Sequence, residues 1–238
     1  MKSNNFIWTD LSTFDLKVSK DFYSKVFGWE YQQVDTDYYY AYKATKEASG
    51  LYVMPKTFVD MGMPSFWMPY IQVDSIADTI SKAKTLGGRV ELTESMENFG
   101  SIALIRDPSG AGFTVYDGNA LDARTVNEES TMVWNELFVS DAKLVLDLYT
   151  HLFDWTTEET ENKRFLVYNN LGENISAIQQ LDNEIKGKHE YWSVFFKVED
   201  IDSTISKVLE LGGNLIYQDY HSALLTDSFG AMFQVIEK

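Results

Sequence analysis

Hydrophobic and polar positions along the chain predict short strands and helices in a fixed order. Residues 6–12 alternate between apolar and polar side chains, as a strand with one buried face does. Asp15 can cap a helix, and apolar side chains then recur at helical spacing until Gly28 ends it. Strand composition returns around Tyr31, in the run YYYAYKA from Tyr38, and in SGLYVMP. This stretch therefore predicts one β-α-β-β-β module.

The same order of elements restarts after the loop KTFVDMGMPS. A strand is predicted over 66–73, and Ser75 caps a helix that the paired glycines after Leu86 end. Further strands are predicted at 90–92, 101–106 and 112–116, with DPSG as the tight turn before the last one. The result is a second β-α-β-β-β module.

The chain then repeats both modules. WTDLSTFDLKVSKDFYSKVFGWE, from Trp8, returns as WNELFVSDAKLVLDLYTHLFDWT, from Trp134. VDSIADTISKAKTLGG returns as VEDIDSTISKVLELGG, and RDPSGAGFTVYD returns as TDSFGAMFQVIE. Three blocks recur in the same order, and a repeat of this size indicates two copies of one domain.

The repeat predicts an α+β fold of four βαβββ modules paired into two domains. The first domain is expected over residues 1–117 and the second over 132–238. The segment 118–131 is polar and without periodicity, and we interpret it as the linker. Each pair of modules is expected to form a curved, mostly antiparallel sheet with helices on its convex face and a concave cleft.

Charge and composition limit the classes of binding partner and of reactive site that we expect. The formal net charge is −16, which disfavours nucleic acid and anionic membrane surfaces as partners. The chain has no cysteine, so thiolate metal sites and cysteine nucleophiles are excluded. Its start, MKSNNFIWTDL, lacks the apolar stretch of a signal peptide, and no segment approaches the ~20 apolar residues that span a bilayer. We therefore expect a cytoplasmic monomer or homodimer.

Several of these motifs together resemble a known family. FYSKVFGWE after a capped helix, LGG after the next helix, and DPSG-A-G-F-T-V in the last hairpin are similar to the glyoxalase, bleomycin-resistance and extradiol-dioxygenase superfamily, also called vicinal oxygen chelate proteins. The resemblance runs from about Ile7 to Asp117 and from about Met132 to Glu237. In the second half DSFG replaces DPSG and FDW replaces FGW. It implies one cleft per half and, in metal-using members, a divalent ion held by His, Gln or Glu from four strands.

The positions that the resemblance assigns to metal ligands carry other residue types here. In the first half they are Trp8, Met68, Thr114 and a position near Leu51; in the second they are Trp134, Ser193, Gln234 and a position near Ala177. An indole offers no lone pair to a metal, and only Gln234 could ligate well. The three histidines, His151, His189 and His221, show no metal-ligand spacing. We therefore expect neither a metal nor another cofactor.

Strand alternation predicts what lines the clefts instead. Residues two apart on a strand share a face. If Trp8 faces the cleft, Asp10 faces it too, and the same holds for Trp134 and Glu136. The other predicted ligand-binding residues are Met68, Tyr70, Gln72, Thr114, Tyr116, Phe195, Lys197 and Gln234. Lys197 is expected to pair with Glu136, whereas Asp10 has no matching cation, which favours the first cleft as the ligand site.

The two carboxylates, Asp10 and Glu136, have three possible roles. Each can be a structural group in a closed cleft, a contact for a bound ligand, or a candidate catalytic acid or base. In the tyrosine run, Tyr38, Tyr40 and Tyr42 are predicted on one face of their strand and Tyr39 on the other. That run is explained by cross-strand packing, by lining of a pocket or by an interface.

Three functions remain open at this point. The first is a metal-free protein that binds a small molecule in an aromatic and acidic cleft, for resistance or sequestration. The second is an enzyme of the same superfamily, a lyase, an isomerase or an oxidoreductase of the dioxygenase type, with a displaced metal site or metal-free acid–base chemistry. The third is a protein whose clefts are packed shut and whose surface makes an assembly.

Overall fold

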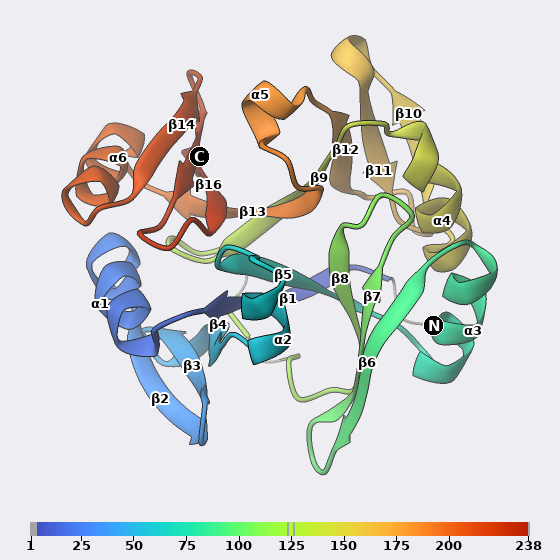
Figure 1. Cartoon of the computed structure of the whole chain (residues 1–238), viewed down its shortest axis with the longest axis horizontal. Helices are drawn as coiled ribbons and strands as arrows, with labels where there is room; N and C mark the ends of the chain where they lie inside the picture. Colours follow the sequence, from blue (N-terminus) through green and yellow to red (C-terminus); the bar gives the residue numbers. More distant parts are fainter. Residues whose placement is uncertain (1–3, 123, 126, 238) are drawn as a thin grey trace. The chain divides into compact units, whose positions relative to one another are not determined.

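A computed structural model describes residues 4–122, 124–125 and 127–237 (Figure 1). The predicted domain limits at residues 1 and 238, and the linker positions 123 and 126, lie outside the described residues. Within the described part of the chain, no helix has the length and the apolar composition that crossing a membrane requires.

The first half of the chain contains two modules in the predicted order. They consist of β1 (Phe6–Thr13), α1 (Leu16–Phe27), β2 (Glu30–Asp35), β3 (Tyr38–Lys43), β4 (Lys46–Val53), α2 (Lys56–Asp60), β5 (Phe66–Gln72), α3 (Ile76–Thr85), β6 (Arg89–Met96), β7 (Gly100–Arg106) and β8 (Gly112–Asp117).

The second half repeats this order, with mostly shorter hairpin strands. Its elements are β9 (Met132–Val139), α4 (Lys143–Phe153), β10 (Thr156–Glu159), the 3₁₀ turn η1 (Glu161–Lys163), β11 (Arg164–Tyr168), β12 (Asn174–Gln180), α5 (Asn183–Lys186), β13 (Tyr191–Val198), α6 (Ile201–Glu210), β14 (Asn214–Gln218), β15 (Ser222–Thr226) and β16 (Met232–Glu237).

The predicted helix ends are confirmed where the sequence carries a cap. The Asp15 side chain accepts a hydrogen bond from the backbone of Val18, and Gly28 adopts the left-handed conformation at φ 71°. Ser75 caps α3 in the same way. The segment KTFVDMGMPS differs from its prediction as a loop, because Pro55 starts the short helix α2 there.

The strands form two mixed eight-stranded sheets in the described residues. Their orders are β2-β3-β4-β1-β5-β8-β7-β6 and β10-β11-β12-β9-β13-β16-β15-β14. In each module the first and last strands pair in parallel, and the hairpin strands pair antiparallel. The predicted α+β class and the four-module architecture are confirmed.

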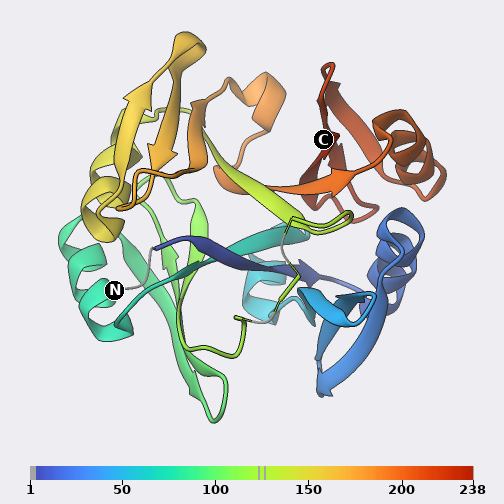
Figure 2. The same ribbon diagram turned by 180° about the vertical axis from the view of Figure 1, so that it is seen from behind.

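The chain divides into two compact units, each assembled from both sequence halves. Unit 1 comprises Met1–Ile7, Pro69–Asp122 and Trp134–Trp192. Unit 2 comprises Trp8–Met68, Ala123–Val133 and Ser193–Lys238. Within unit 2, α1 lies beside α6; within unit 1, α3 lies beside α4 (Figures 1 and 2).

Both units have an aromatic core built from equivalent residues of the repeat. In unit 2 the ring of Tyr23 contacts the rings of Trp67 and Phe233. In unit 1 the equivalent ring of Tyr149 contacts Trp192 and Phe113. Each core therefore contains a helix residue from one half and a hairpin residue from the other.

Candidate functional site

The first W-x-D motif forms a closed hydrogen-bonded group in unit 2. The indole Nε1 of Trp8 donates to Oδ1 of Asp10 at 2.7 Å. The hydroxyl of Tyr38 donates to the same oxygen at 2.8 Å. Trp8 and Asp10 are each 1% exposed, so this carboxylate is almost wholly removed from water. Burial and the nearby Asp10 carboxylate raise the pKa of Tyr38 well above its ordinary value.

A glycine on the neighbouring strand leaves room for this group. Strand β4 pairs with β1 so that Gly50 lies opposite Asp10. A Cβ atom at Gly50 would overlap the Asp10 carboxylate and the Tyr38 hydroxyl. Gly50, one residue before Leu51, is therefore the strand position that faces Asp10. Leu51 pairs with the buried Leu11 on the opposite face of the sheet.

The second half carries an ionic version of the same group in unit 1. The indole Nε1 of Trp134 donates to Oε1 of Glu136 at 3.1 Å. Arg164 forms an ion pair with the same oxygen. The partner of Glu136 is thus Arg164, and the expectation that Lys197 pairs with it was wrong. The sequence did not show this because Arg164 lies on a strand that folds back from 28 residues away.

Tyr38 and Arg164 occupy equivalent positions in the two halves. On β3, Tyr40 lies opposite Gly50. Tyr38 is two residues before Tyr40 and therefore lies on the same face of the strand. On β11, Leu166 lies opposite Ala177, and Arg164 precedes it in the same way. In each half, the partner of the carboxylate therefore comes from the same position of the third strand. The partner is a phenol in the first half and a guanidinium in the second.

The two groups differ in their access to solvent. The side chain of Arg164 is 37% exposed and that of Glu136 is 10% exposed. Trp134 is half-buried, whereas its counterpart Trp8 is buried. These exposures favour the second-half group as the accessible one, although the sequence favours the first half.

The other predicted ligand-binding residues are mostly buried and are divided between the units. In unit 1, Tyr70 pairs with Thr114 and Gln72 with Tyr116 across β5 and β8. The hydroxyl of Tyr116 is tied to the backbone, since it donates to the Phe99 carbonyl at 2.7 Å and accepts from the Ala120 amide at 2.9 Å.

In unit 2, Phe195 pairs with Gln234 across β13 and β16. Nε2 of Gln234 donates to the hydroxyl of Ser193 at 3.4 Å. Met68 is buried, and its carbonyl accepts a hydrogen bond from Thr9. Lys197 is half-buried, and its backbone pairs with Ser130 and Thr131. The ligand-contact role of these residues stays a prediction.

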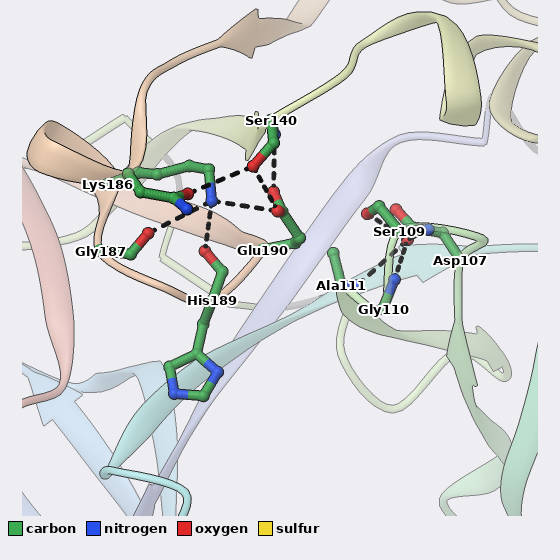
Figure 3. Close-up of polar contacts among 10 residues, drawn as sticks. Asp107, Ser109, Gly110, Ala111, Ser140, Lys186, Gly187, His189 and Glu190 are labelled. Atoms are coloured by element: carbon green, nitrogen blue, oxygen red, sulfur yellow. Dashed lines mark hydrogen bonds and ion pairs between the residues drawn. The ribbon is translucent and has the colours of Figure 1, made fainter.

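The most strongly repeated motifs form a second kind of buried network, which the sequence analysis missed. In unit 1 the indole of Trp192 donates to the hydroxyl of Tyr149, which donates to Oδ2 of Asp107, both at 2.9 Å. Oδ1 of Asp107 accepts from the backbone amides of Ser109, Gly110 and Ala111, in and just after the DPSG turn (Figure 3). Burial raises the pKa of Asp107 above its ordinary value of 3.8.

Unit 2 contains the same network. The indole of Trp67 donates to the hydroxyl of Tyr23 at 3.1 Å, and Tyr23 donates to Asp227 at 3.2 Å. The Asp227 carboxylate caps the DSFG turn, and burial raises its pKa as well. The recurrence of Tyr, Trp and Asp in both halves was the available signal. These motifs therefore serve the fold.

A buried lysine in unit 1 is also structural. The side chain of Lys186 is completely buried, and its ammonium donates to the carbonyls of Gly187 and His189 and to the carboxylate of Glu190 (Figure 3). Glu190 accepts from both the backbone and the hydroxyl of Ser140. The ring of His189 points away from the ammonium (Figure 3). This cluster fastens the segment after β12 to the end of β9.

The residues at the implied ligand positions do not fit a divalent ion. The indoles of Trp8 and Trp134 donate to carboxylates and have no lone pair to give. The positions opposite the carboxylates, Gly50 and Ala177, carry no donor atom. Within the described ranges, no group of three or more His, Cys, Asp or Glu side chains could hold a metal ion. A stable site needs three or four such ligands.

Comparison with known proteins finds a matching family model and similar proteins. Residues 5–115 match the model of the Glyoxalase/Bleomycin resistance protein/Dioxygenase superfamily. A protein of Mycobacterium tuberculosis named as a candidate glyoxylase, CFP32, is 30% identical over 97% of this chain and 93% of its own length. The anthracycline biosynthesis protein DnrV of Streptomyces peucetius is 25% identical over 97% of this chain and 92% of its own.

A solved structure shows the same fold. The Mn(II)-bound glyoxalase from Novosphingobium aromaticivorans superposes with a TM-score of 0.69, covering 99% of this chain and 82% of that one. The identity is 11%, so this likeness concerns the fold alone.

Proposed function

Because this chain belongs to the Glyoxalase/Bleomycin resistance protein/Dioxygenase superfamily, we propose that it binds a small organic molecule without a divalent ion. The observation that carries the proposal is the indole–carboxylate hydrogen bond in each half. Trp8 donates to Asp10 at 2.7 Å and Trp134 donates to Glu136 at 3.1 Å. Each indole stands where the resemblance places the first metal ligand.

This hydrogen bond changes the chemistry of the position. A metal ligand presents a lone pair, whereas an indole presents only its N–H. In both halves that N–H is already committed to a carboxylate oxygen. The carboxylate in turn takes a second donor from the third strand, which is Tyr38 or Arg164. The arrangement supports recognition by hydrogen bonds, ion pairing and aromatic contact.

The second-half group is the part of the chain that we assign to the ligand. Its arginine side chain is 37% exposed, while Trp8 and Asp10 in the equivalent group are each 1% exposed. A half-buried tryptophan beside a charged pair is a common composition for a small-molecule site. The naming of one relative for anthracycline biosynthesis supports a ligand with aromatic rings.

Two measurements test this proposal on the untagged, full-length protein. Elemental analysis after incubation with Mn, Fe, Ni or Zn and desalting should show well below one equivalent of each. A thermal-shift screen of aromatic small molecules should produce hits, since a ligand at 100 times its dissociation constant adds about 2.7 kcal/mol of stability. Stoichiometric, tightly held metal would refute the metal-free part, and a screen without any hit would refute ligand binding.

An enzymatic function is the second candidate. It is favoured by the 30% identity to a protein named as a candidate glyoxylase and by the presence of a carboxylate, Glu136, beside the accessible group. Lyase, isomerase or dioxygenase chemistry would require turnover of a compound identified in the screen. Glu136→Gln keeps the size of the side chain and removes its charge. Product formation that this variant abolishes, without loss of binding, would establish acid–base chemistry at Glu136.

A further inference from the structure

The guanidinium of Arg164 is bonded through one nitrogen and keeps most of its N–H donors available. Its Nη2 contacts Oε1 of Glu136. Across residues 4–122, 124–125 and 127–237, Glu136 is the single side-chain partner of this guanidinium. A guanidinium carries five N–H donors in a rigid fork, so four remain for solvent or for a bound group. The part of the side chain that is exposed, 37%, provides the access.

The fold brings the guanidinium of Arg164 and the indole of Trp134 to the same carboxylate oxygen. Strand β12 lies between β9 and β11, and its small residue Ala177 lies directly opposite Glu136. With only a methyl group in between, Arg164 reaches across β12 to the carboxylate. The same carboxylate holds the Nε1 of Trp134. Glu136 is therefore a positioning residue that orients both the guanidinium and the indole.

We propose that Arg164 binds the carboxylate group of a small aromatic molecule whose ring packs against Trp134. This inference rests on the proposed ligand-binding function and specifies its chemistry. Arg164 is more exposed than Glu136, 37% against 10%, so an approaching ligand meets the positive member of the pair first. A carboxylate can accept two parallel N–H bonds from the guanidinium, a charge-assisted contact that a cation cannot make. In a chain of net charge −16, a local cation of this kind offsets the repulsion that an anionic ligand meets.

The first half explains why one such site per chain is expected. Tyr38 occupies the register of Arg164, and its single O–H is used on Asp10. Asp10 itself is 1% exposed, so its carboxylate is not open to a ligand from solvent. The repeat has therefore diverged into a closed, structural half and a half that presents a cation.

The test uses matched pairs of probes on the full-length protein. Benzoate, phenylacetate, indole-3-acetate and 2-naphthoate are each compared with their primary amides by titration calorimetry. We expect one site per chain, with the acids binding at least about tenfold more tightly than the amides, since charge-assisted hydrogen bonds are roughly twice as strong as neutral ones. Arg164→Gln should remove this preference, and Arg164→Lys should keep part of it because the charge remains without the fork.

Two controls separate the outcomes. Arg89→Gln changes an arginine that is 69% exposed and paired with Glu91, and it should leave both affinities unchanged. The double variant Glu136→Gln with Arg164→Gln avoids an unpaired carboxylate and should behave as Arg164→Gln does. Equal affinity for acid and amide, or a preference that survives Arg164→Gln, overturns this inference while ligand binding itself stands. A broad screen in which no compound of any charge binds overturns the proposed function and this inference together.

Discussion

The hydroxyl of Tyr149 donates a 2.9 Å hydrogen bond to Asp107, although the two residues come from opposite halves of the repeat. The same relationship joins Tyr23 to Asp227 at 3.2 Å. In each unit a helix of one half is thereby bonded to the last turn of the other half. The chemistry at these sites is structural, since each carboxylate also caps its own turn.

Replacing Tyr149 by Phe should destabilise the protein. The change removes a donor from a buried carboxylate and an acceptor from the Trp192 indole, and each buried group left without a partner costs about 1–3 kcal/mol. Urea unfolding measures the loss. Tyr217→Phe, at a side chain that is 56% exposed, should change the unfolding free energy by less than about 0.5 kcal/mol. Equal stability of the two variants would contradict the role of the buried network.

Asp107 should make stability depend on pH in a specific direction. Burial raises its pKa above 3.8, so the folded state holds this proton more tightly than the unfolded state does. The stabilisation is complete below about pH 3.8 and is lost as the pH rises through the higher folded-state pKa. Relative to Asp107→Asn, the wild type should therefore lose unfolding free energy above that pH. Urea unfolding at several pH values checks it, and a difference that is flat with pH would refute it.

The sequence predicted most of the fold because the repeat and the caps are local signals. Asp15, Gly28 and Ser75 mark helix ends by their own side chains or conformations, and these ends were confirmed. The prediction that Tyr39 faces away from its neighbours in the tyrosine run agrees with its contact to Lys20 on α1. The α2 helix was missed because it is only five residues long, too short for a recurring apolar stripe.

The candidate site could be predicted only in part. Alternation correctly joined Trp8 with Asp10 and Trp134 with Glu136, since residues two apart share a strand face. It could not find the partners Tyr38 and Arg164, because these depend on the register of a third strand. Hairpin register is set by turn geometry and bulges. The choice of Lys197 followed alternation alone and lacked that information.

Replacing the two carboxylates by alanine should have unequal effects on stability. Asp10→Ala leaves the Trp8 N–H and the Tyr38 O–H without this acceptor in a dry environment, and we expect a loss of about 3 kcal/mol. Glu136→Ala returns an exposed guanidinium to water, and we expect a loss of about 1 kcal/mol. Chemical unfolding of both variants tests the difference. A smaller loss for Asp10→Ala than for Glu136→Ala would contradict a structural role for the first group.

Gly50 and Ala177 provide the sharpest test of how the two halves diverged, because they hold equivalent positions opposite the two carboxylates. In Gly50→Ala the new methyl group overlaps Asp10 and Tyr38, and overpacking of this kind costs about 1–3 kcal/mol. Adding Tyr38→Phe removes the overlapping hydroxyl, so the double variant should lose less than the sum of the single losses. Ala177→Gly should cost only about 1 kcal/mol, from backbone entropy in a strand. Strict additivity of Gly50→Ala and Tyr38→Phe in urea unfolding would show that the glycine does not make room for the hydroxyl.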